Sequence, residues 1–137
     1  YEQEKQPHML ELASSYVEKL TGERYTLDIL GINKGVALIN NNGERLELKF
    51  WSSGLADQVY LSLRLALAKV FSYQVEPLPI ILDDILVRFD ENRQRSALEL
   101  LAELGKNQQI WLFTCQRSVY DMAQSIMGID CHRLSRS

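Results

Sequence analysis

The sequence predicts an α/β fold with a parallel β-α-β core, flanking helices and an N-terminal antiparallel β meander. Two short apolar segments, residues 79–83 and 109–114, flank a helical segment with one apolar face, residues 91–104. Strands joined through one helix pair in parallel by a right-handed crossover. Residues 25–50 show the alternation of apolar side chains that is typical of antiparallel strands.

Composition and charge indicate a soluble globular protein of one domain. The chain has 137 residues, of which 46% are hydrophobic and 24% charged, a balance that supports a real core and excludes a disordered chain. The net charge of −3 excludes a global basic field, so any DNA should bind elsewhere in a complete complex. Because no signal peptide or long apolar run is visible, we expect a cytoplasmic protein without a membrane partner.

The two cysteines, Cys115 and Cys131, belong to no CxxC or Cys/His cluster. A zinc site is therefore not expected, and reduced thiols are the default. Cys115 ends an apolar strand, so we interpret it as a small core residue, with a redox thiol as the alternative. The chain opens at Tyr1 in a polar stretch, and we expect it to be a piece of a longer protein.

The first elements in chain order are a helix and a meander. Apolar residues recur at helical spacing over residues 10–20, and Gly22 suits the end of that helix. Alternation then predicts three strands, at residues 25–29, 36–39 and 46–50, with an NNNG turn between the second and the third.

The later elements are mostly apolar. Ser52 or Ser53 can cap a helix over residues 55–71, which is apolar nearly all round and therefore buried. Both core strands are apolar without alternation, which predicts that they are fully buried. A last helix over residues 116–128 and a short strand over residues 129–134 complete the chain.

Polar side chains follow both core strands at their carboxyl ends. One strand ends in Asp83-Asp84 and the other in Thr114-Cys115-Gln116. Because ligands of parallel α/β sheets bind beyond the carboxyl ends of the strands, these groups should converge on one edge.

The two consecutive aspartates should point in different directions, since side chains alternate along a strand. They are therefore poorly placed to bind one ion together, and separate roles for the two carboxylates fit better. One would hold Mg²⁺ or its water, and the other would polarise an attacking water. The alternative is that both are solvated residues that open a loop.

The turn Ser52-Ser53-Gly54 also has two interpretations. A helix start offers backbone N–H groups, hydroxyls and the positive end of the helix dipole, and glycine permits close approach of a phosphate. The simpler interpretation is a helix cap alone.

Four motifs in order resemble the C-terminal half of an ABC-type, P-loop ATPase head. The resemblance is to the SMC, RecN and SbcC group, and within it to the YhaN-type ATPases. "WSSGLADQVYLSLRLALA" resembles the signature motif, usually LSxG with a downstream Gln, and "PIILDD" resembles Walker B. "VRFDENR" resembles the D-loop, and "LFTCQ" resembles the switch region, which usually reads FTCH in YhaN-type proteins.

The resemblance implies roles for the signature turn. Ser52 and Gly54 would contact the γ-phosphate of ATP bound to an opposing head, with Ser53 in the same turn. Gln58 would support the signature helix. Residues 1–22 would be a helix leaving a coiled coil, and residues 23–137 the C-terminal lobe of the head.

The resemblance also assigns the strand ends. Asp83 would hold the Mg²⁺ shell through water, and Asp84 would stand where most members carry the catalytic Glu. Asp90 would lie in the D-loop at the dimer interface, and Gln116 at the switch position. Trp51 replaces the usual Leu of the signature.

Two departures predict slow or impaired hydrolysis. Asp84 is one methylene shorter than Glu, and even about 1 Å can matter in catalysis. Gln116 replaces His, and Gln can hydrogen-bond a phosphate but cannot carry a proton or positive charge.

The chain contains no GxxxxGK[ST] P-loop. In the family this motif lies in an N-terminal half beyond a long coiled coil. We therefore predict that the isolated chain holds no ATP or Mg²⁺ and is inactive. The implied partners are the Walker A half of the same protein, a second head in a homodimer, a nuclease subunit, and DNA through the complete complex.

Three functions are compatible with these sequence patterns. The first is half of an ATPase engine in DNA repair or maintenance. The second is a metal-dependent phosphoesterase using Asp83 and Asp84 directly, although two-metal sites use several spread-out carboxylates and often His. The third is a nucleotide-dependent dimerisation or scaffold domain with impaired hydrolysis.

Overall fold

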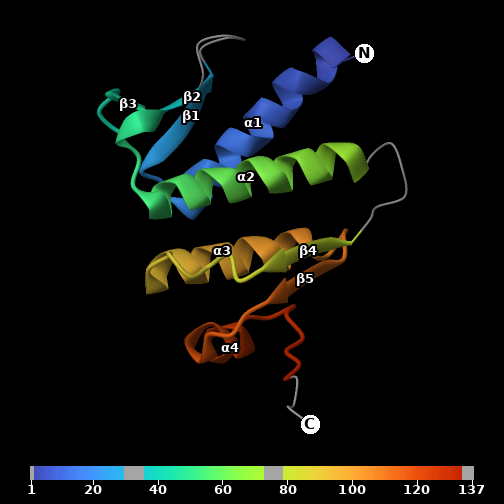
Figure 1. Cartoon of the computed structure of the whole chain (residues 1–137). Coiled ribbons are helices and arrows are strands. Elements are labelled where there is room, and N and C mark those ends of the chain that lie inside the picture. Colours follow the sequence, from blue (N-terminus) through green and yellow to red (C-terminus); the bar gives the residue numbers. More distant parts are fainter. Residues whose placement is uncertain (1, 30–35, 73–78, 134–137) are drawn as a thin grey trace.

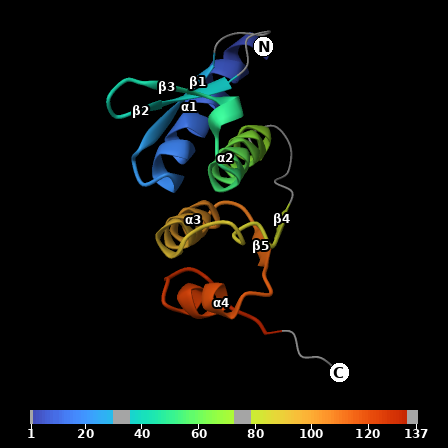
Figure 2. The same ribbon diagram turned by 60° about the vertical axis from the view of Figure 1, so that its left-hand side comes forward.

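The computed structural model describes residues 2–29, 36–72 and 79–133. The elements lie in successive layers (Figures 1 and 2). Helix α1 (Glu2–Leu20) and a three-stranded antiparallel sheet lie at one end, and α2 (Ser53–Ser72) crosses the middle. Beyond α2 come α3 (Glu91–Leu104) and the parallel pair β4 (Ile80–Asp83) and β5 (Ile110–Phe113), with α4 (Arg117–Gln124) at the far end.

Helix α1 ends where the sequence predicts. The Thr21 hydroxyl donates to the carbonyl of Val17 at 2.7 Å, and Gly22 follows with a positive φ of 69°. Such a backbone favours glycine, because it has no Cβ to clash. Ser14 of α1 accepts a hydrogen bond from the Leu27 N–H at 3.1 Å, which fixes the helix to the first strand.

The meander has the predicted strand order, β1 (Tyr25–Ile29), β2 (Val36–Asn40) and β3 (Arg45–Glu47). Each strand pairs antiparallel with the next one along the chain. The turn closes on Asn40, whose Oδ1 accepts from the N–H groups of Asn42 and Glu44, both at 2.9 Å.

The predicted extension of the third strand to residue 50 is wrong. The Trp51 indole N–H donates to the Leu46 carbonyl at 3.0 Å and folds the chain back. Leu48–Phe50 therefore form a 3-10 turn, η1.

Helix α2 joins two apolar clusters. The prediction that it is buried nearly all round is only partly confirmed, because Tyr60 and Leu67 on its outer side are 65% and 45% exposed. Leu61, Leu65 and Ala66 belong to the main core with α3 and β4. Val59 belongs to a second cluster with Val17 of α1 and Leu38 of β2.

The parallel β-α-β core is confirmed, with Ile80 opposite Ile110 and Asp83 opposite Phe113. The prediction that both strands are fully buried is wrong. Ile80 and Leu82 are buried, but Ile81 is 56% exposed, and Trp111 and Phe113 are also exposed. Burial alternates along β4 because the described elements cover one face of this sheet and leave the other open.

The C-terminal elements are shorter than predicted. Helix α4 ends at Gln124 rather than at residue 128. Residues 129–133 form no strand, and residue 134 lies outside the described residues. Among the described helices, none combines the length and apolar character needed to cross a membrane.

Candidate functional site

The carboxyl ends of β4 and β5 converge, as their parallel pairing predicts. The Asp84 N–H donates to the Phe113 carbonyl at 2.7 Å and closes the sheet. The Thr114 hydroxyl reaches Asp84 Oδ1 at 3.4 Å, and the Cys115 thiol reaches Asp84 Oδ2 at 3.4 Å. Both oxygens of one carboxylate are thus contacted by the end of β5.

The two aspartates point in different directions. Asp83 is exposed and shares the open face of the sheet with Ile81, because alternate residues of a strand face the same side. Asp84 is half-buried and has a left-handed backbone, with φ at 53°. Aspartate tolerates this conformation better than most residues, and the turn carries the chain out of the sheet there.

Cys115 is exposed rather than a core residue, so that interpretation is wrong. The Asp84 carboxylate raises the pKa of the thiol, first through the hydrogen bond and then through its charge, with a smaller contribution from desolvation. The thiol therefore stays a protonated donor at neutral pH. The signal that could have revealed this contact was the position of Thr114 and Cys115 immediately after a strand parallel to β4.

Gln116 lies beside this cluster. Its backbone N–H donates to the Thr114 hydroxyl at 3.1 Å. Its side-chain Oε1 is buried and has no hydrogen-bond partner among the described residues. An amide in this state can accept from a water or, after a half-turn, present its N–H₂ group to an anion.

Ser52 is the cap of α2, since its Oγ accepts from the Leu55 N–H at 3.2 Å. Ser53 is exposed at the first position of the helix. A Cβ added to Gly54 would lie 3.0 Å from the backbone oxygen of Arg88, so glycine lets α2 approach the loop after β4. Gln58 is buried and its carbonyl accepts from Ser62, inside the helix that carries the turn.

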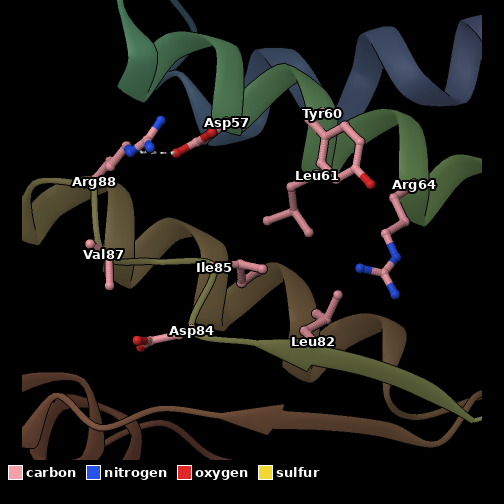
Figure 3. A pocket seen from close by; sticks show the side chains of 9 residues that line it. All are labelled: Asp57, Tyr60, Leu61, Arg64, Leu82, Asp84, Ile85, Val87 and Arg88. Carbon is pink, nitrogen blue, oxygen red and sulfur yellow. Dashed lines mark ion pairs between the residues drawn. The ribbon is translucent and has the colours of Figure 1, made fainter.

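A pocket of about 350 Å³ lies between residues 57–64 of α2 on one side and the end of β4 with its following loop on the other. Figure 3 shows Asp57 and Arg88 facing each other across it, and their ion pair measures 3.7 Å. Arg64 donates to the Ile81 carbonyl on the edge of β4 at 2.9 Å. Sequence patterns alone do not single out Arg64 or Arg88 as site residues. The lining residues are Asp57, Tyr60, Leu61, Arg64, Leu82, Asp84, Ile85, Val87 and Arg88.

Asp90 caps α3, because its Oδ1 accepts from the Arg93 N–H at 2.8 Å. Gln94 is buried and donates to the Leu86 carbonyl at 3.0 Å, which fixes the preceding loop to α3. The segment that resembles a D-loop is therefore held at both ends.

The described residues contain no group of three or more His, Cys, Asp or Glu side chains that could hold a metal ion. Asp83 offers one exposed hard oxygen ligand of the kind Mg²⁺ prefers. This donor set fits one contribution to a shared Mg²⁺ site and does not fit the several-carboxylate site of a two-metal phosphoesterase.

The fold is that of SMC ATPase head domains. A chain from a structural study of ATP-driven dimerisation and DNA-stimulated activation of SMC ATPases matches with a TM-score of 0.70 at 16% identity, over 85% of this chain and 73% of that chain. The SMC head domain from Thermotoga maritima matches with a TM-score of 0.65 at 18% identity, over 85% of this chain and 40% of that chain. An Smc head bound to the C-winged helix domain of ScpA gives 0.66 at 15% identity, over 85% and 37%.

In sequence the chain is similar to YhaN of Bacillus subtilis (strain 168), an uncharacterized protein. The two are 31% identical over 121 residues, which are 87% of this chain and 12% of YhaN. The chain thus spans a small part of the relative's length. No protein-family model matches the sequence. The resemblance to the C-terminal lobe of SMC-like heads is confirmed.

Proposed function

We propose that this chain is the C-terminal part of an SMC-like ATPase that binds and hydrolyses ATP between two heads. One observation carries the proposal: Asp84, Thr114, Cys115 and Gln116 meet at the carboxyl edge of a parallel strand pair. This edge is where ligands of α/β sheets bind. The SMC head fold supports the same assignment.

The residues at the strand ends have separate roles in ATP hydrolysis. Asp83 supplies an oxygen ligand toward Mg²⁺, which neutralises phosphate charge when it is bound. Asp84 accepts the proton of an attacking water, or orients that water, through the lone pairs that its contacts to β5 leave free. Gln116 orients the same water or the γ-phosphate through its unpartnered amide.

The signature-like turn acts on ATP held by the opposing head. Ser52 and Ser53 are exposed at the start of a 20-residue helix, where hydroxyls, backbone N–H groups and the helix dipole favour an anion. The phosphate cradle comes from a Walker A half of the same protein. DNA repair or maintenance, with a nuclease partner, is the setting we propose for the whole protein.

Turnover by the full-length protein tests the role of Asp84. Asp84→Asn removes the base, so kcat should fall roughly a hundredfold or more. Asp84→Glu restores a carboxylate with longer reach and should retain activity. Asp130→Asn changes an exposed aspartate outside the site and is the matched control. If both Asp84 variants match the wild type, Asp84 is not the base.

A scaffold domain that dimerises on nucleotide is the second candidate. It is favoured by the contacts of both Asp84 oxygens to β5 and by the Gln at the switch position. In this case the full-length protein would dimerise with ATP, while neither Asp84 variant would change a negligible turnover.

A further inference from the structure

We propose that Thr114 and Cys115 are positioning residues that aim the Asp84 carboxylate, an inference that rests on the proposed ATPase function. One donor contacts each carboxylate oxygen, Thr114 at Oδ1 and Cys115 at Oδ2, both at 3.4 Å. Two contacts on different oxygens restrict rotation of the carboxylate about its terminal bond more tightly than one contact would.

The direction of the Thr114 hydrogen bond is set by its neighbour. The hydroxyl has one proton and two lone pairs, and it accepts the N–H of Gln116 at 3.1 Å. Its proton is therefore free to point at Asp84. The same hydroxyl connects Asp84 to the backbone of Gln116, so the two residues at the proposed reaction site are held in one network.

The Cys115 thiol is also a donor at neutral pH. Its pKa is raised by Asp84, so the protonated form persists. Among the hydrogen bonds of the described residues, the Cys115 thiol donates to Asp84 Oδ2 and to no other acceptor.

The backbone of Asp84 completes the arrangement. Its φ of 53° turns the residue out of the strand, and its N–H is held by the Phe113 carbonyl at 2.7 Å. Each carboxylate oxygen keeps one further lone pair for a water. Because aspartate reaches less far than glutamate, the direction of these lone pairs decides whether a water can be engaged.

The contact itself can be measured on this chain by alkylating Cys115 with iodoacetamide. In a Cys131→Ser background, Asp84→Asn should speed alkylation roughly two- to fivefold at neutral pH, the effect of one exposed charge interaction. Asparagine tolerates positive φ, so the turn is retained. Glu99→Gln removes an equal charge from an exposed position of α3 and should leave the rate unchanged. Equal rates in the two variants would overturn the contact.

Turnover by the full-length protein tests the positioning. Thr114→Val and Cys115→Ala should each lower kcat roughly tenfold to a hundredfold with KM unchanged, because misdirection of a catalytic group is costly. Thr114→Ser and Cys115→Ser keep a donor and should recover most of the loss. A loss that serine does not recover, or no loss at all, would overturn the inference.

Failure of the proposed ATPase function and failure of the positioning role give different results. Turnover that is insensitive to Asp84→Asn refutes the proposed function, and the positioning role falls with it. Turnover that depends on Asp84 but not on Thr114 or Cys115 refutes the positioning role alone. The alkylation ratio requires no turnover and reports the contact in either case.

Discussion

Gly54→Ala, at the start of α2, has two opposing effects on the free energy of unfolding. Alanine favours a helix interior over glycine by about 1 kcal/mol, which is an upper limit for Gly54, the second residue of α2. The added Cβ, however, would lie 3.0 Å from the Arg88 backbone oxygen, and such overpacking costs about 1–3 kcal/mol. The loop that carries Arg88 is held by Gln94 at 3.0 Å and by the Asp57 ion pair, so it cannot retreat freely. The midpoint of the cost exceeds the gain by ~1 kcal/mol.

Urea unfolding of the chain, followed by circular dichroism, measures this difference. Gly54→Ala should lower the free energy of unfolding by ~1 kcal/mol, with an unchanged urea slope. Ser53→Ala is the matched control, because Ser53 is exposed in the same helical turn. If Gly54→Ala is as stable as Ser53→Ala or more stable, the close approach of α2 to the Arg88 backbone is refuted.

Three further predictions concern stability. Leu82 is fully buried while its neighbour Ile81 is 56% exposed, so Leu82→Ala should cost ~2–5 kcal/mol and Ile81→Ala under ~1 kcal/mol in urea unfolding; equal costs would contradict the alternating burial. Ser52→Ala should cost ~1 kcal/mol and Ser52→Asp almost nothing, because only the first loses the cap; equal losses would refute capping by Ser52. Because the folded state raises the pKa of Cys115 above its ordinary value of 9.0, the contact stabilises the chain below that pH and this stability is lost as pH rises through the raised pKa. The difference in Tm between wild type and Cys115→Ala should therefore shrink at high pH, and a constant difference would contradict it.

Local patterns were sufficient to predict much of the fold. The period of apolar residues gave the helices and the β-α-β core, and the NNNG sequence gave the turn at Asn40. The cap at Ser52 and the meeting of Asp84 with the end of β5 also followed from local rules, since parallel strands end at one edge.

Other features depend on tertiary context that local patterns do not encode. An apolar run such as residues 79–83 indicates burial, but it cannot say which elements of the chain cover each face, and Ile81 is exposed. Leu48 and Phe50 continue the alternation of β3, yet the Trp51 hydrogen bond to Leu46 bends the chain into η1.

Residue type alone predicts Cys115 in the core. It is exposed because the chain leaves the sheet after Phe113, and its contact with Asp84 appears only once β4 and β5 are paired.

The most direct test of the central claim is the mass of the full-length Asp84→Asn protein in solution, measured by analytical ultracentrifugation with and without Mg²⁺-ATP. Slow hydrolysis should trap ATP between two heads, so a dimer should form only with nucleotide. Adding Ser52→Arg should abolish the dimer by obstructing the signature-like turn. Gln124→Arg, exposed at the end of α4, should not. A mass that ignores ATP, or a dimer that tolerates Ser52→Arg, would contradict ATP binding between two heads.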